Sequence, residues 1–254
     1  MRIDLNCDMG EGLGAFELGH DADILPYISS ANIACGFHAG SPLIMARMVA
    51  FAKQSGVAIG AHPSYPDLEG FGRREMNLAP EEVEDIVLYQ IGALDAFCKA
   101  EGVELNHVKP HGALYNQAAK DLLLAAAIAR AVRRFSPSLV LVGLAGSKLI
   151  EAGLDAGLVV AREAFPDRAY LKDGSLMPRS QKGAVLENPE EVMLNALRLA
   201  QDGIQVETAD GSLDFYQIDT LCLHGDNPAA LENARMVSQV LRDAGFDIRP
   251  IQVH

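Results

Sequence analysis

The sequence predicts an α/β fold in which parallel strands alternate with helices along the whole chain. Short apolar runs alternate with longer segments of helical pattern, which is typical of parallel strands joined by right-handed crossovers. Glycines such as Gly56, Gly102 and Gly245 stand where helices are expected to end, because glycine readily adopts the left-handed backbone of a helix C-terminus. Seven strands of this kind can form an open sheet or close into a barrel.

The expected elements follow one another closely. The strands are expected at Ile3–Cys7, Asn32–Cys35, Val57–Ala61, Glu104–Val108, Leu139–Gly143, Leu158–Arg162 and Thr220–Leu223. The helices are expected at Ser41–Ser55, Ala79–Glu101, Asn116–Phe135, Ser147–Asp155, Pro189–Asp202 and Pro228–Ala244. Residues alternate between apolar and polar within Ile204–Ile218, around Ala209-Asp210-Gly211, which predicts a small β-hairpin.

Composition narrows the class of protein. The 254 residues, 49% of them hydrophobic, suit one large α/β domain over residues 1–254. The net charge of -13 argues against nucleic acid or an anionic membrane as the main partner. No apolar run approaches the ~20 residues of a membrane span, and the N-terminal Met1-Arg2-Ile3-Asp4 lacks a signal-peptide core. The four cysteines form no CxxC pair, so we expect reduced thiols and a cytoplasmic location.

Two long segments interrupt the alternation, Ser64–Leu78 and Phe165–Glu187. Loops of this length in a compact domain are usually lids or binding loops. We therefore expect residues 64–78 and 165–187 to be active-site loops. The first carries Arg73 and Arg74, and the second carries Arg168 and Arg179. These arginines could hold a carboxylate or a phosphate, or they could be solvated loop charges.

Polar groups stand at the ends of the predicted strands. His38, His62, His111 and His224 end or closely follow four of them, Asp8 follows the first strand, and Asp226 follows the last. Ligand sites in parallel α/β proteins lie at the carboxyl ends of the strands. A single histidine in such a place is more often structural, but the shared position of these residues predicts one common pocket.

The strand pattern also indicates a polar interior. Side chains alternate between the two faces of a strand, so Ile3, Leu5 and Cys7 oppose Asp4, Asn6 and Asp8. An ordinary barrel fills its axis with branched aliphatic residues. Buried polar groups cost free energy unless they are paired, so this many on one face predicts a polar pocket. His107 lies deeper in its strand, and either a structural or a functional role fits it.

Several familiar nucleotide and nucleophile motifs are absent from the sequence. There is no GxxxxGK[ST] loop, no GxGxxG after the first strand and no GxSxG elbow. The remaining groups suit general acid–base chemistry on a polar carbonyl compound, or metal-assisted hydrolysis. The expected catalytic residues are Asp8, His38, His62, Lys109 and His111, and the expected substrate-binding residues are Asn6, Glu11, Arg73, Arg179, His224 and Asp226. A divalent metal, if one binds, is expected at Asp8, His38 and His62.

Six motifs resemble the LamB/YcsF family, and the resemblance covers essentially the whole chain. The motifs are DLNCDMGE at Asp4–Glu11, NIACGFHAG at Asn32–Gly40, GAHPSYPD at Gly60–Asp67, GFGRR at Gly70–Arg74, VKPHGALY at Val108–Tyr115 and CLHGD at Cys222–Asp226. The resemblance implies a single-domain, distorted seven-stranded parallel β/α barrel related to polysaccharide deacetylases.

The resemblance also implies an activity. Members of the family are similar to one component of an ATP-dependent 5-oxoprolinase, which cleaves 5-oxo-L-proline (pyroglutamate) to L-glutamate and hydrolyses ATP to ADP and phosphate together with two other subunits. Because this chain lacks a phosphate loop, the partner subunits are expected to share in handling ATP. Two alternatives stay open: a stand-alone metal-dependent amide hydrolase or deacetylase, and a noncatalytic substrate-binding subunit. The sequence is also compatible with a homo-oligomer.

Overall fold

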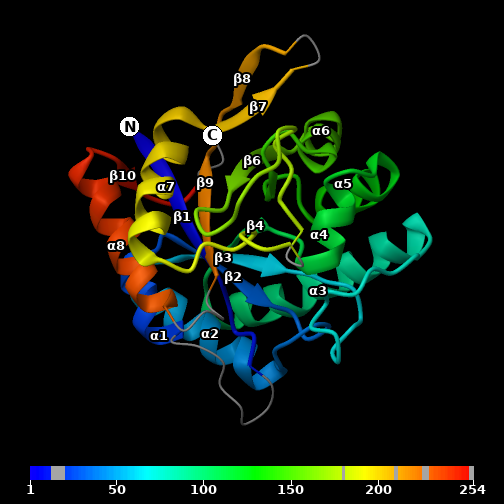
Figure 1. The fold of residues 1–254 in the computed structure, drawn as a ribbon. Helices are drawn as coiled ribbons and strands as arrows, with labels where there is room; N and C mark the ends of the chain where they lie inside the picture. Colours follow the sequence, from blue (N-terminus) through cyan, green and yellow to red (C-terminus); the bar gives the residue numbers. More distant parts are fainter. Residues whose placement is uncertain (13–20, 179–180, 209–210, 225–228, 252–254) are drawn as a thin grey trace.

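The computed structural model describes residues 1–12, 21–178, 181–208, 211–224 and 229–251. Its centre is a closed barrel of seven parallel strands in the order β1-β2-β3-β4-β5-β6-β9 (Figure 1), because β9 pairs with both β6 and β1. The strands are β1 (Arg2–Met9), β2 (Ser30–Ala34), β3 (Ala58–His62), β4 (Leu105–Val108), β5 (Val140–Leu144), β6 (Val159–Ala164) and β9 (Thr220–His224). All seven predicted strands are confirmed, and a short strand β10 (Asp247–Ile248) adds to β1.

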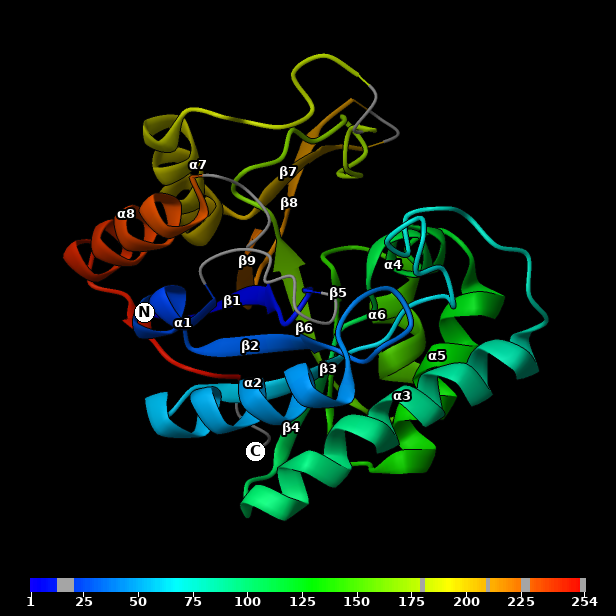
Figure 2. The same ribbon diagram turned by 90° about the horizontal axis from the view of Figure 1, so that it is seen from below.

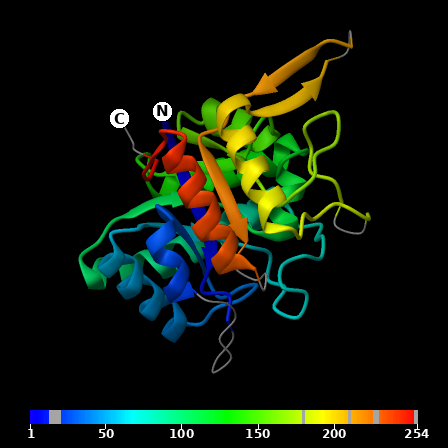
Figure 3. The same cartoon turned by 60° about the vertical axis from the view of Figure 1, so that its left-hand side comes forward.

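Helices surround the barrel, and α7 and α8 lie side by side on its outside (Figures 2 and 3). The helices are α1 (Asp21–Ile24), the 3-10 turn η1 (Leu25–Tyr27), α2 (Pro42–Ser55), α3 (Pro80–Glu101), α4 (Gly112–Ala118), α5 (Leu122–Phe135), α6 (Lys148–Asp155), α7 (Pro189–Asp202) and α8 (Ala230–Asp243). The predicted start and end of α2 are confirmed: the Ser41 hydroxyl accepts from the Ile44 N–H, and Gly56 is left-handed.

The single helix expected over Asn116–Phe135 is wrong, because the structure has two helices there. The first, α4, ends at Ala118, and α5 begins at Leu122. The Asp121 side chain accepts hydrogen bonds from the N–H groups of Leu123 and Leu124. An aspartate with an extended backbone that binds these N–H groups starts a new helix, so the apolar periodicity of the segment concealed a break.

The predicted hairpin is confirmed: β7 (Ile204–Glu207) and β8 (Leu213–Tyr216) pair antiparallel and project from the barrel in Figure 1. The 64–78 segment contains no helix or strand, and the described part of 165–187 has only isolated bridges, Arg168 with Val185 and Tyr170 with Leu176. No helix in the described part of the chain is long and apolar enough to cross a bilayer.

The two faces of the strands separate as the alternation predicts. Ile3, Leu5 and Cys7 belong to the main hydrophobic cluster. Asp4 and Asn6, on the other face of β1, are also buried. Inside the barrel their side chains form hydrogen bonds with Thr220 of β9, and Asn6 also donates to Glu163 of β6. The interior of this barrel is therefore polar and hydrogen-bonded.

A glycine makes room for one of these interior groups. The register of β3 against β4 shifts between Ile59 and Gly60. A Cβ atom at Gly60 would lie 2.0 Å from Nε2 of His107. That nitrogen hydrogen-bonds to Oδ1 of Asn32 at 2.7 Å and the ring is buried, so the imidazole occupies space that only glycine leaves open. In this structure His107 is part of the interior packing.

We predict that Gly60→Ala destabilises the protein. The added methyl group must displace a buried, hydrogen-bonded ring, and overpacking of this kind typically costs about 1–3 kcal/mol. Urea denaturation followed by circular dichroism measures the free energy of unfolding. Gly92→Ala is the matched control. Gly92 lies inside α3, and a Cβ atom there would have only Phe135 within 4.0 Å, so this change should be neutral or stabilising. Equal effects of the two changes would contradict the role given to Gly60.

Candidate active site

A cavity of about 690 Å³ lies at the carboxyl ends of the strands. Strand ends and both long loops form its walls. Its lining includes Asp8, Glu11, His62, Lys109 and His111 near the strand ends, Arg73 and Glu75 from the first loop, and Phe165, Arg168 and residues 173–178 from the second. Three of the strand-end residues predicted to converge, Asp8, His62 and His111, thus border a single cavity.

A buried ammonium group occupies the floor of this cavity. Lys109 Nζ lies 2.8 Å from Asp8 Oδ1 and 3.0 Å from Glu163 Oε1, and only 2% of the lysine side chain is exposed. The same nitrogen contacts the amide oxygen of Asn6 and the sulfur of Cys222. Burial by itself lowers the pKa of Lys109, but the neighbouring Asp8, Cys222 and Glu163 outweigh it and hold that pKa well above its usual value. Lys109 is therefore a fixed cation.

Asp8 is held from two sides. Its Oδ1 accepts hydrogen bonds from Lys109 Nζ and, at 2.8 Å, from Asn32 Nδ2. Its Oδ2 lies 3.4 Å from Nε2 of His62. Because Asp8 also lines the cavity, one carboxylate oxygen is fixed by the lysine while the other faces an imidazole. This geometry suits a group that receives or positions a proton.

Glu163 completes the floor, and it was missed by the sequence analysis. It lies in β6 with no exposed surface, and it accepts hydrogen bonds from Asn6 Nδ2 at 3.1 Å and from the Tyr115 hydroxyl at 2.8 Å. Burial and the adjacent Glu163 raise the pKa of Tyr115 well above its usual value, so this phenol stays a donor. The expected strand stopped at Arg162, one residue short of a carboxylate that obeys the same strand-end rule.

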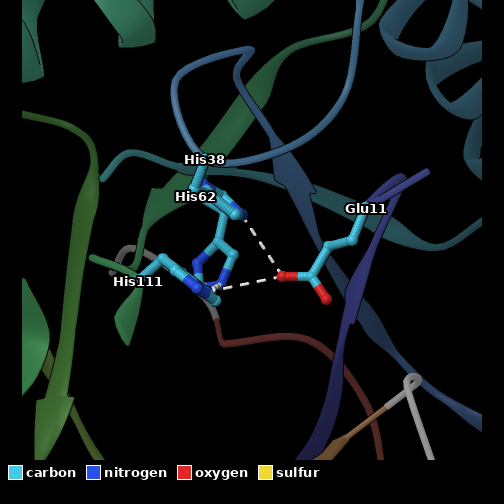
Figure 4. A group of neighbouring side chains, drawn as sticks. All are labelled: Glu11, His38, His62 and His111. Atoms are coloured by element: carbon cyan, nitrogen blue, oxygen red, sulfur yellow. Dashed lines mark hydrogen bonds and ion pairs between the residues drawn. The ribbon is translucent and has the colours of Figure 1, made fainter. Parts of the chain in front are cut away.

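Beside this floor, three histidines and a glutamate form a compact cluster (Figure 4). One nitrogen or oxygen atom from each of Glu11, His38, His62 and His111 lies within 4.8 Å of the other three. His38 Nε2 is 3.2 Å and His111 Nδ1 is 3.4 Å from Glu11 Oε1, and His62 Nε2 is 3.0 Å from His111 Nδ1. The rings of His38 and His111 stack at 3.8 Å. The four polar atoms therefore face one small volume.

The 64–78 loop fixes one of these rings. Phe71 has a φ of 54°, which is unusual for a residue with a side chain, and its carbonyl oxygen accepts a hydrogen bond from His111 Nε2 at 2.9 Å. A Cβ at Gly72 would lie 2.2 Å from Ser64 Oγ and 2.9 Å from His111 Cδ2. The Gly-Phe-Gly sequence thus lets the loop backbone reach the imidazole.

Burial keeps two of the imidazoles uncharged. It lowers the pKa of His111 to about 3, with a further lowering by His62. It also lowers the pKa of His38 well below its usual value, with His111 and His62 adding to the effect. Neutral imidazoles carry one donor and one acceptor nitrogen each. The cluster therefore presents lone pairs, whereas the adjacent floor presents an ammonium group and carboxylates.

The other predicted site residues fall in different places. Asn6 is buried among the polar interior groups, and His38 is buried in the cluster. Arg73 lines the cavity, with its guanidinium 4.9 Å from the centre of the Phe71 ring. The metal ligands expected from the sequence were Asp8, His38 and His62. The compact cluster keeps both histidines, lacks Asp8 and adds Glu11 and His111. The side chain of His224, together with Arg179 and Asp226, lies outside the described residues.

The remaining loop arginines have structural partners. Arg74 forms hydrogen bonds and an ion pair with Asp67 in its own loop. Arg168 donates to the carbonyl oxygens of Ala184 at 3.1 Å and Met177 at 2.6 Å. Each guanidinium thus holds together the loop that carries it.

Comparison with known proteins now identifies the family. The LamB/YcsF family model matches residues 3–254. The chain belongs to this family. It is 55% identical over 249 residues to a protein of Heliobacterium modesticaldum named as the A subunit of 5-oxoprolinase, covering 98% of both chains. A protein of the same name from Pyrococcus abyssi is 50% identical over 252 residues, covering 99% of this chain and 98% of that relative. The family resemblance read from the six motifs is confirmed.

A solved structure of high sequence identity agrees with the fold. A lactam utilization protein from Thermus thermophilus superposes with a TM-score of 0.91 at 54% identity, covering 99% of this chain and 100% of that chain. A family 4 carbohydrate esterase from Streptomyces lividans reaches a TM-score of 0.48 at 12% identity, covering 99% of this chain and 93% of that one. The second likeness is too distant to bear on either the fold or the chemistry.

We predict that Lys109→Met strongly destabilises the protein. The substitution leaves Asp8 and Glu163 buried without their cation, and breaking a buried pair in this way typically costs about 3–5 kcal/mol. Lys148→Met is the matched control, because the Lys148–Glu151 pair lies at 2.6 Å with each side chain 47% exposed. Such a surface pair contributes at most about 1 kcal/mol. Chemical denaturation measures the free energy of unfolding of both variants. Equal losses would show that the buried Lys109 pair contributes no more to stability than the surface pair.

Proposed function

We propose that this chain is a subunit of an ATP-dependent 5-oxoprolinase, which opens 5-oxo-L-proline to L-glutamate while ATP becomes ADP and phosphate. The observation that carries the proposal is the match of 55% identity across 98% of both chains to a protein named as the A subunit of 5-oxoprolinase. The cavity supports it: pockets for small molecules measure about 300–1,000 Å³, and this one measures about 690 Å³. Its polar floor suits a small, hydrogen-bonding lactam better than an apolar ligand.

The lactam of 5-oxo-L-proline is a stable amide, so its ring carbon must be activated before water can attack it. In the proposed reaction, the γ-phosphoryl group of ATP is transferred to the lactam oxygen, which makes the ring carbon electrophilic. Water adds to that carbon, the ring C–N bond breaks with a proton going to nitrogen, and a second water releases phosphate from the resulting acyl phosphate. We assign Asp8 as the base together with His62, whose Nε2 lies 3.4 Å from Asp8 Oδ2. Lys109, His38 and His111 complete the assigned catalytic group, and the Lys109 cation would stabilise negative charge on the reacting oxygen.

The remaining assignments extend the site outward. We propose that residues 1–254 form a single barrel domain and that residues 64–78 and 165–187 are its active-site loops. Their support is that the described parts of both loops line the cavity. Asn6 and Glu11 are proposed to bind substrate together with Arg73, Arg179, His224 and Asp226. The location of Asn6 beneath the floor gives it an indirect part, through its hydrogen bonds to Glu163 and Lys109.

Nucleotide handling is proposed to involve two further subunits. The sequence contains no GxxxxGK[ST] phosphate loop, so a site for ATP built with partner chains is the simpler arrangement. The proposed compartment is the cytoplasm, which suits the four free, buried cysteines.

Reconstitution tests the function. The chain mixed with its two candidate partner subunits, ATP and 5-oxo-L-proline should release L-glutamate and phosphate, whereas the chain alone should release little of either. Glutamate is measured by an enzyme-coupled assay and phosphate colorimetrically. Robust ATP-independent hydrolysis by the isolated chain would instead favour the stand-alone hydrolase.

The same assay tests the assigned base. Asp8→Asn in the assembled complex should lower turnover by about 10²–10⁴-fold, the usual contribution of a general base. Asp155→Asn is the matched control, because this exposed residue ends α6 and precedes β6, away from the carboxyl ends of the strands. Near-normal turnover by Asp8→Asn in an intact complex would favour a noncatalytic substrate-binding subunit.

Arg73 offers a separate prediction about substrate binding. Arg73→Lys keeps the positive charge but loses the planar fork that holds a carboxylate through two hydrogen bonds. We expect a higher KM for 5-oxo-L-proline, measured by initial rates in the reconstituted complex. Arg130→Lys is the control, because Arg130 pairs with Glu84 on the outer helices. A KM equal to that of the control would show that Arg73 is a solvated loop charge.

A further inference from the structure

We propose that Glu11, His38, His62 and His111 bind one divalent transition-metal ion of the Zn²⁺ type. The cluster lies beside the acid–lysine floor, and it is built from four elements or loops that are distant in sequence. The cluster shares residues with the site proposed above, but metal uptake is measured on this chain without turnover, so each proposal can fail without the other.

The hydrogen bonds of two histidines fix where their protons lie. His62 Nδ1 is 2.7 Å from the carbonyl oxygen of Lys109, and His111 Nε2 is 2.9 Å from that of Phe71. A carbonyl oxygen only accepts hydrogen bonds, so both of these ring nitrogens carry the proton. In the neutral rings, the opposite nitrogens, His62 Nε2 and His111 Nδ1, therefore carry lone pairs.

Those two lone-pair nitrogens face each other at 3.0 Å. Without a proton or a cation between them, two acceptors at this distance repel one another. Glu11 Oε1, only 3.4 Å from His111 Nδ1, adds a further acceptor on the same side. A metal cation satisfies all of these groups together.

The distances also fit tetrahedral coordination. Zinc binds imidazole nitrogen and carboxylate oxygen at about 2.0–2.2 Å, so neighbouring donors in a regular tetrahedron lie about 3.3–3.6 Å apart. The three contacts that join the cluster measure 3.0, 3.2 and 3.4 Å. Small outward movements of the side chains would therefore accommodate an ion, and imidazole with carboxylate is a donor set that suits zinc.

The surroundings match those of established metal sites. Ligating histidines usually donate their second nitrogen to a carbonyl or carboxylate, which fixes ring orientation, and His62 and His111 both do so. His38 Nε2 lies 3.2 Å from Glu11 Oε1, and its Nδ1 is buried with no hydrogen-bond partner among the described residues; a metal at Nε2 would place the proton of the neutral ring on Nδ1. A bound ion would supply Lewis acidity beside the cavity, and it would tie the Phe71 loop to the barrel.

Direct metal analysis tests the proposal. The wild-type chain is stripped with a chelator, desalted and titrated with Zn²⁺ or Co²⁺. We expect one equivalent bound per chain by elemental analysis, and an intense visible absorption from Co²⁺ in a tetrahedral site. Bound metal should also raise the thermal unfolding temperature, since a ligand that binds only the folded state stabilises it.

Variants locate the ion. Glu11→Gln and the double change His62→Gln/His111→Gln should weaken Co²⁺ binding by at least about 10–100-fold, the loss seen even for outer partners of a metal. Glu75→Gln is the matched control, because Glu75 lines the same cavity but lies outside the cluster. It should bind as the wild type does. Circular dichroism checks that each variant is folded.

Two results would overturn the proposal. One is a folded wild-type chain that takes up no stoichiometric Zn²⁺ or Co²⁺, a result that needs no variant. The other is equal Co²⁺ affinity in wild type, Glu75→Gln and a folded Glu11→Gln, which would place the ion elsewhere.

Discussion

The buried ammonium of Lys109 is the interaction on which the rest of the molecule depends. It lies 2.8 Å from Asp8 and 3.0 Å from Glu163, which belong to β1 and β6, while the lysine immediately follows β4. Without that cation, two carboxylates would share a buried space with no positive partner, which is among the most costly arrangements in a protein interior. The same contact therefore ties three parts of the barrel together and sets the charge of the cavity floor.

Lys109 also joins the floor to the histidine cluster. Its ammonium binds Asp8, and its backbone carbonyl accepts the Nδ1 proton of His62. The lone pair of His62 Nε2 is thereby turned toward both Asp8 and His111. One residue thus positions a carboxylate through its side chain and an imidazole through its backbone. The floor and the cluster are consequently parts of one coupled network.

The sequence predicted the fold better than it predicted the site. Alternation of apolar and polar residues located seven strands and the hairpin, because burial of one face leaves a strong local signal. The Asp121 cap was missed, since the apolar pattern runs through it. For the site, the strand-end rule found Asp8, His62 and His111 but not Glu163, whose strand continues two residues beyond its expected end. Which nitrogen of His62 or His111 is protonated depends on carbonyl groups of other segments, so no local pattern could show it.

Charge balance links the proposed substrate to the proposed metal. Asp8, Glu11 and Glu163 bring three carboxyl groups to the floor and cluster, whereas Lys109 brings one ammonium, and burial keeps His38 and His111 neutral. Such a site repels an anion such as 5-oxo-L-proline unless more positive charge is present. Arg73 can supply some at the rim of the cavity, where water screens it. A divalent ion in the cluster would supply it beside the floor, in a drier environment where each charge acts more strongly.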